Sequence, residues 1–151
     1  MIDKAIKALE GYIYWAKITV PNQYGKYSCE LVLSDKDADY FESIGVPTIN
    51  GTAKKQDGSL KTSDHYEGRA VVISRNINRK DGSPNIKPKL YDANGEQIDS
   101  IVWNGSKVTA KYRIWETENQ FGHFVGLDLI KVRVDEEAPR PEETDFNDDD
   151  F

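Results

Sequence analysis

The sequence predicts a mainly β domain that closes into a small barrel and is followed by an acidic tail. Short stretches rich in aromatic and β-branched residues recur along the chain between turn residues, as is typical of β-strands. After Val134 the composition changes to acidic residues and proline, which supply no packed core. The chain has 151 residues, enough for one domain, so we expect a domain at 1–134 and a disordered tail at 135–151.

The beginning of the chain is expected to contain a short helix and a β-hairpin. Residues 2–10 place Ile2, Ile6 and Leu9 at helical spacing, which predicts a short amphipathic N-terminal turn or helix. Two strands are then expected, at residues 11–20 and 26–33. The turn residues between these strands predict a hairpin loop.

A second short helix is expected after this hairpin. Ser34 is a suitable N-cap for it, and Gly45 marks its end. Residues 48–67 contain glycine, lysine and serine without periodicity, which predicts a long mobile loop.

The second half of the chain is again rich in β-strand patterns. Strands are expected at residues 69–77, 87–91, 97–103, 107–116 and 121–134. Asn94-Gly95 is a strong hairpin signal between two of them. Short strands with one intervening helix favour a single OB-like, partly open barrel, because closure removes exposed strand edges. A β-sandwich is the alternative, since periodicity does not distinguish the two.

The charge of the chain is distributed unevenly. The 26 acidic and 20 basic residues give a formal net charge of −6. Nine of the acidic residues and one base, Arg140, lie in residues 135–151, which therefore carry −8. The remaining 17 acidic and 19 basic residues leave the domain at +2. A slightly basic domain with an acidic tail is compatible with a nucleic-acid partner.

Catalytic and metal-binding motifs are missing from the sequence. Cys29 is the single cysteine, and His65 and His123 are far apart, so neither a disulfide nor a metal site is expected. Phosphate-binding loops and nucleophile motifs are also missing, so we expect no cofactor, no catalytic residue and no enzymatic activity. Cys29 shares the apparent buried face of its strand with Tyr27 and Leu31. No export signal or membrane span is visible, which predicts a cytoplasmic protein.

The clearest functional signal is the alternation in residues 107–115. One face of this expected strand carries three cations and a tryptophan, and the other carries Val108, Ala110, Tyr112 and Ile114, which should face the core. Cations that follow phosphates and rings that stack on bases suit single-stranded nucleic acid. The alternative is an ordinary solvated face on which Trp115 covers an edge.

Aromatic and basic residues are combined in the same way elsewhere. Trp15 and Lys17 share one strand face, opposite Tyr14, Ala16 and Ile18, and we expect Tyr12, Tyr112 and Phe124 to belong to the core. The candidate DNA-binding residues are Trp15, Lys17, Tyr24, Arg75, Arg79, Lys80, Lys87, Lys89, Tyr91, Lys107, Lys111, Arg113 and Trp115.

Phenylalanines within the acidic tail indicate a recognition peptide. A tail that only solvates the protein gains nothing from Phe146 or from Phe151 as its last residue. A ring suits a small apolar pocket, and Asp148, Asp149 and Asp150 suit a basic rim around that pocket. These five residues are the candidate partner-binding residues of the tail.

Residues 145–151 (DFNDDDF) resemble the acidic, phenylalanine-terminated tails of bacterial and phage single-stranded DNA-binding proteins. Residues 103–106 (WNGS) and the following strand pair look like the bacteriophage subgroup built on one OB-fold. The resemblance implies a protein that coats and protects single-stranded DNA in phage DNA replication, recombination and repair.

Such a protein would be a monomer or homodimer in the host cell cytoplasm. Its tail would compete with DNA for the groove and would contact a polymerase, a primase-helicase or a nuclease. The competing interpretations from the residues themselves are an acidic DNA-mimic inhibitor and a phage structural or assembly protein.

Overall fold

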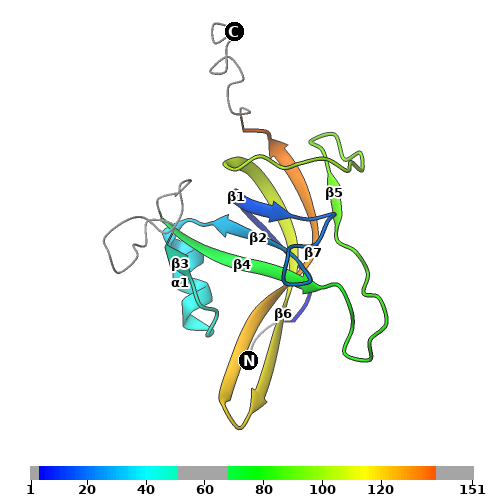
Figure 1. Cartoon of the computed structure of the whole chain (residues 1–151). Helices are drawn as coiled ribbons and strands as arrows, with labels where there is room; N and C mark the ends of the chain where they lie inside the picture. The colour runs from blue at the N-terminus through cyan, green and yellow to red at the C-terminus, as the bar shows by residue number, and fades with distance from the viewer. Residues whose placement is uncertain (1–3, 51–67, 139–151) are drawn as a thin grey trace, which may run out of the picture.

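The computed structural model describes residues 4–50 and 68–138 of the chain (Figure 1). The elements in these residues are, in chain order, β1 (Lys7–Lys17), β2 (Lys26–Val32), α1 (Asp35–Ser43), β3 (Ile49–Asn50), β4 (Arg69–Asn76), β5 (Lys89–Tyr91), β6 (Ser106–Asn119) and β7 (Gly122–Glu136).

Five of the strands form a closed barrel, as predicted. They are hydrogen-bonded in the order β4-β2-β1-β6-β7, and a parallel pairing of β4 with β7 closes the ring. This closure consists of two residue pairs, Ile73 with Leu127 and Ser74 with Asp128. Strand β3 pairs antiparallel with β4, and β5 pairs in parallel with β7. The arrangement is an OB-like barrel, so the β-sandwich alternative is wrong.

Strand β1 belongs to both halves of the barrel wall. Its residues from Lys7 to Ile13 pair with β6, and those from Tyr12 to Lys17 pair with β2. The prediction of a helix at residues 2–10 was therefore wrong for the residues from Lys7 onwards. Pairing with β6 satisfies their backbone groups, and Leu9 points inward while Ile6 stays 50% exposed.

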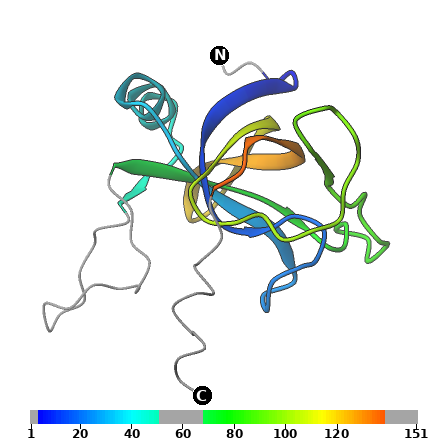
Figure 2. The same cartoon turned by 90° about the horizontal axis from the view of Figure 1, so that it is seen from above.

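The helix α1 is the single helix of the described residues and stands to one side of the barrel, next to β3 (Figure 2). Ser34 caps it as predicted, because its hydroxyl accepts a hydrogen bond from the Asp37 N–H at 3.3 Å. Phe41 is buried and packs edge to face on Tyr112, with ring centroids 5.7 Å apart. This contact fixes the helix to the barrel. None of the described residues forms a helix long and apolar enough to cross a membrane.

The core fills the barrel with residues from alternate positions of the strands. The predicted inward positions of β6, Val108, Ala110, Tyr112 and Ile114, are all buried. Cys29 is also buried, as expected, and this burial raises the pKa of its thiol to about 12, with a smaller contribution from the charge of Glu30. Such a thiol is unreactive at neutral pH.

Two aromatic residues expected in the core lie on the surface. Tyr12 is 52% exposed and Phe124 is 45% exposed. Their neighbours Ile13 and Val125 occupy the inward positions, and successive side chains of a strand point to opposite faces. The prediction that Tyr12 and Phe124 are core residues was therefore wrong, and that for Tyr112 is confirmed.

The strand expected at residues 97–103 is another error. Only an isolated bridge between Gln97 and Tyr91 forms there, and Val102 is buried from an irregular segment. The turn at Asn94-Gly95 does form, because the Asp92 carboxylate accepts hydrogen bonds from the N–H groups of residues 94 and 96. Within the expected loop at 48–67, residues 49 and 50 form β3, and residues 51–67 lie outside the described residues.

Candidate nucleic-acid interface

A groove of about 490 Å³ lies on the outer face of β1, β2 and β4, beside the loop that joins β1 to β2. It brings together three of the predicted residues, Trp15, Lys17 and Tyr24. The structure adds Pro21, Asn22, Gln23, Ser28, Cys29, Glu30 and Val72 to its lining. In an OB-fold this face and its neighbouring loops bind oligonucleotides or oligosaccharides.

Trp15 is held at the groove by an irregularity in β1. The register with β2 shifts between Tyr14 and Lys17, and Trp15 has a φ of 54°, in the left-handed region. Its N–H donates a hydrogen bond to the Asn104 side-chain oxygen at 2.8 Å. This bond fixes an unfavourable backbone conformation, and the ring stays 38% exposed.

The loop between β1 and β2 is ordered by Asn22, a residue that the sequence analysis did not select. Its side-chain oxygen accepts hydrogen bonds from the N–H groups of Tyr24, at 2.9 Å, and Lys26, at 3.1 Å. Its amide donates to the Ser28 hydroxyl at 3.2 Å. The loop thereby presents the Tyr24 ring, which is 76% exposed. An asparagine within a turn was the signal for this role.

The register of the barrel extends the same face toward Trp115. Glu30 pairs with Val72, the residue before Ile73. Ile73 pairs with Leu127, and the residue before Leu127, Gly126, pairs with Trp115. The indole of Trp115 lies across Gly126, because a Cβ built there would overlap the ring and lie 2.7 Å from its Nε1. Trp115 is 45% exposed, so much of its ring is available for stacking.

Gly126 was not selected from the sequence. A glycine in the interior of a strand marks a close approach of another group, and this was the available signal.

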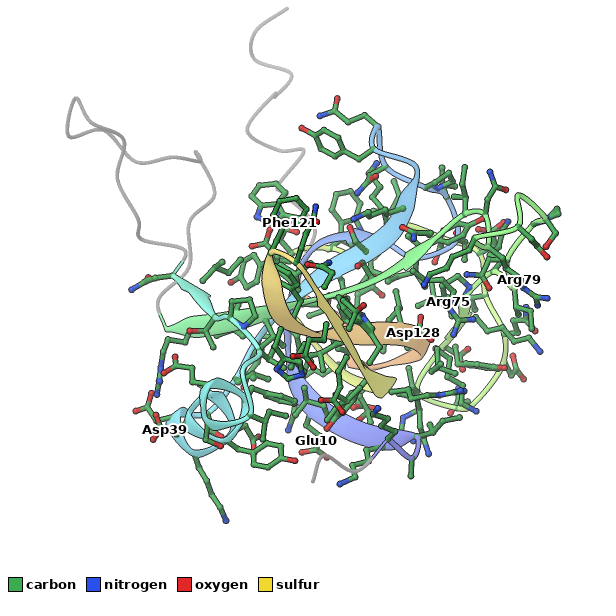
Figure 3. The ribbon with its side chains drawn as sticks, turned by 90° about the horizontal axis from the view of Figure 1, so that it is seen from below. Glu10, Asp39, Arg75, Arg79, Phe121 and Asp128 are labelled. Atoms are coloured by element: carbon green, nitrogen blue, oxygen red, sulfur yellow. The ribbon has the colours of Figure 1, made fainter. Side chains whose placement is uncertain are left out.

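The β6–β7 hairpin continues beyond the barrel (Figure 1). It carries further aromatic side chains. Phe121 lies at the turn of the hairpin (Figure 3). Its side chain is 79% exposed. Phe124 pairs with Thr117 on the outer side of the same hairpin. Neither ring was among the predicted DNA-binding residues.

Arg75 has a structural partner. Its guanidinium donates to both carboxylate oxygens of Asp128, at 2.9 and 2.7 Å, and to the Ile86 carbonyl at 3.1 Å (Figure 3). The side chain of Arg75 is only 11% exposed. This pair joins β4 to β7 where the barrel closes. A DNA contact by Arg75 stays a prediction.

The other predicted cations lie away from the groove. Arg79 and Lys80 are exposed on the loop that follows β4, and Lys87 is exposed just before β5. The outer face of β5, β7 and β6 carries Lys89, Tyr91, Lys107 and Lys111, together with Lys131 and Arg133, which were not predicted. Arg113 and Trp115 follow Lys111 on the outer side of β6, and Arg113 pairs with Asp128.

No group of three or more histidine, cysteine, aspartate or glutamate side chains in residues 4–50 and 68–138 could hold a metal ion. The tail residues Phe146, Asp148, Asp149, Asp150 and Phe151 lie outside the described residues. The lining of the groove combines the aromatic rings of Trp15 and Tyr24 with the charge of Lys17.

The fold and the groove define a single OB-type barrel with an aromatic, partly basic binding face. No protein-family model and no curated protein matches the chain. Similar solved structures are the single-stranded DNA-binding protein from bacteriophage Enc34, at 15% identity and a TM-score of 0.58, and gp2.5, the single-stranded DNA-binding protein encoded by bacteriophage T7, at 18% identity and a TM-score of 0.60.

These likenesses extend over nearly the whole chain. The Enc34 match covers 91% of this chain and 85% of that protein, and the T7 match covers 95% and 92%. The Enc34 protein was also solved in complex with single-stranded DNA, and that structure matches with a TM-score of 0.57 at 14% identity. The chain thus has the fold of these phage single-stranded DNA-binding proteins.

Proposed function

We propose that this chain is a phage-type protein that binds single-stranded DNA without sequence specificity and coats and protects it. The observation that carries the proposal is the row of exposed rings, Trp15, Tyr24 and Trp115, along one barrel face with Lys17 beside them. The fold is shared with two phage proteins that bind single-stranded DNA.

The side chains of the groove support stacking more than base-specific readout. Every base has an aromatic face, and one stacked base contributes about 1–3 kcal/mol regardless of its identity. Lys17 is placed to attract phosphates. Arg75 neutralises Asp128, so this carboxylate does not repel the strand as a free charge would. Duplex DNA hides its base faces, so the groove should prefer unpaired strands.

The test is a fluorescence anisotropy titration of the full chain with single-stranded and duplex oligonucleotides of equal length at several salt concentrations. We expect tighter binding to the single strand and a loss of affinity with salt, because phosphate contacts release counterions. Lys17→Gln should lower the salt slope, whereas Lys36→Gln, an exposed lysine on α1, should not. Equal affinity for duplex, or no binding at low salt, would overturn the proposal.

We also propose that the acidic end of the chain, expected at residues 135–151, acts as a tail that serves phage replication, recombination and repair in the host cytoplasm. Asp135 and Glu136 belong to β7, so the proposed tail begins after Glu136. Residues 137–151 contain seven acidic residues and Arg140, and their charge of −6 would compete with DNA for the groove. The tethered segment has a local concentration in about the millimolar range.

Two variants of the full chain separate the roles of the tail. Replacing Asp148, Asp149 and Asp150 with asparagine should tighten DNA binding at low salt. Phe151→Ala should leave DNA affinity nearly unchanged and abolish recruitment of the polymerase, primase-helicase or nuclease partner. Unchanged DNA affinity in the first variant would exclude competition, and intact partner binding in the second would exclude recognition of Phe151.

A further inference from the structure

Three lysines form a row across the outer face of β5, β7 and β6. Lys89 on β5 pairs directly with Lys131 on β7, and Lys131 pairs directly with Lys111 on β6. Like charges on directly opposed residues of neighbouring strands destabilise a sheet. Among the described residues, no salt bridge involves any of these three lysines. A bound anion would relieve the repulsion.

The surroundings of the row favour an extended anion over a single small ion. A cleft of about 290 Å³ lies beside the row and is lined by Tyr91, Gly95, Thr109, Lys111, Lys131, Val132 and Arg133. It therefore includes two of the three lysines, and Lys89 lies next to it through its pairing with Lys131. The ammonium of Lys131 lies 5.6 Å from the centre of the Tyr91 ring, so ring and charge are presented together.

The acids of β7 on either side of Lys131, Asp128 and Asp135, each form an ion pair with an arginine and not with the lysine row. Asp135 accepts hydrogen bonds from Thr109 at 2.6 Å and from Arg133 at 2.6 Å. Its charge is therefore largely balanced by Arg133. Glu10 on β1, which pairs with Thr109, and Glu136 on β7, which pairs with Lys107, are further carboxylates near this face. The face carries more positive than negative charge.

The outer side of β6 connects this row to the groove. Trp115, Arg113 and Lys111 occupy successive outward positions of one strand. Trp115 lies on Gly126, and Lys111 belongs to the row, four residues or about 13 Å away along β6. A strand that leaves the groove over Trp115 would meet Arg113 and then the three lysines.

We propose that the row Lys89, Lys131 and Lys111 is a second, phosphate-binding track for the same single strand. DNA stacks in the groove on β1, β2 and β4, passes along β6, and crosses the row with its backbone. This inference rests on the proposed function and extends it, because the row contributes only when the strand is longer than the groove. The other available anion is the acidic tail of the chain, and the experiment separates the two.

The experiment uses the full chain and oligothymidylates of increasing length. The test variant is Lys111→Gln/Lys131→Gln, and its control is Lys36→Glu, which changes the net charge by the same two units on α1. Each phosphate contact to a single strand contributes about 0.7 to the slope of log affinity against log salt. With long oligonucleotides the test variant loses two such contacts, so the magnitude of this slope should fall by about 1.4. For oligonucleotides that fill only the groove, neither variant should change the slope.

Each outcome decides one question. The second track is overturned if the Lys111→Gln/Lys131→Gln variant has an unchanged salt slope with long oligonucleotides. It is also overturned if this variant lowers the slope equally with long and short oligonucleotides. If the intact chain binds no oligonucleotide at all, the proposed function itself fails. The same pair of substitutions is then measured in the Asp148→Asn/Asp149→Asn/Asp150→Asn background. If the two lysine substitutions still lower the salt slope for long oligonucleotides in this background, the row binds DNA. If they no longer change the slope, the row binds the tail.

Discussion

Replacing Gly126 with alanine should displace the ring of Trp115 without substituting any of the proposed DNA-binding residues. A Cβ at this position would overlap the six-membered part of the Trp115 indole and lie 2.7 Å from its Nε1. The neighbour is a side chain that is 45% exposed, so the ring can turn away into solvent while the strand stays paired. The substitution should therefore displace the platform and leave the barrel closed.

The magnitude follows from the contacts of the ring. Loss of one stacked base costs about 1–3 kcal/mol, which weakens binding by a factor of about 5 to 150. About half of the ring is buried, roughly 100 Å², so the loss of stability is at most about 2.5 kcal/mol at 25 cal/mol per Å². DNA affinity should thus fall in a protein that still unfolds cooperatively.

The assay is a double-mutant cycle with Trp115→Ala. We expect Gly126→Ala and Trp115→Ala to weaken single-strand binding by similar factors, and the double variant to be no weaker than Trp115→Ala alone. Urea unfolding followed by circular dichroism measures the folded fraction of each protein. The reasoning is refuted if Gly126→Ala leaves the affinity for single-stranded DNA unchanged. It is also refuted if Gly126→Ala weakens this affinity by the same factor in the Trp115→Ala background as in the intact chain.

Three further predictions concern the barrel. Arg75→Ala should lower the free energy of unfolding in urea by about 1–3 kcal/mol, because Asp128 loses a bidentate partner where the barrel closes; an unchanged midpoint would contradict this. Cys29 should resist thiol reagents at pH 8 in the folded protein, since burial raises its pKa to about 12; rapid labelling without denaturant would contradict this. Hydrogen bonding from Thr48 lowers the pKa of Glu42 below its ordinary value of 4.5. The contribution of Glu42 to the free energy of unfolding is therefore present above pH 4.5 and is lost as the pH falls through the pKa of the folded state. In an acid titration, Glu42→Gln should lose less stability between neutral and acidic pH than the intact chain does.

The sequence predicted those parts of the fold that depend on local alternation. The pattern of β6 placed Val108, Ala110, Tyr112 and Ile114 in the core, and all four are buried. The same reasoning failed for residues 2–10, where a few apolar residues at helical spacing were outweighed by pairing with β6, about 100 residues later. Pairing partners so distant in the chain leave no local signal.

The candidate site was predictable in composition but not in arrangement. Trp15, Lys17 and Tyr24 are near one another in sequence and line the same groove. Arg75 has its partner 53 residues away, so a sequence pattern could not show that its charge is already paired. Lys131 joins Lys111 and Lys89 only through the register of three strands, which the structure supplies.

The path of the strand through the groove can be measured most directly by photo-crosslinking. The full chain is irradiated with oligothymidylates that carry iododeoxyuridine at single positions, and the crosslinked peptides are identified by mass spectrometry. We expect the adducts on Trp15, Tyr24 and Trp115, the exposed rings of the groove face. Adducts confined to other surfaces, such as Tyr40 on α1, which is 43% exposed, would contradict binding in the groove.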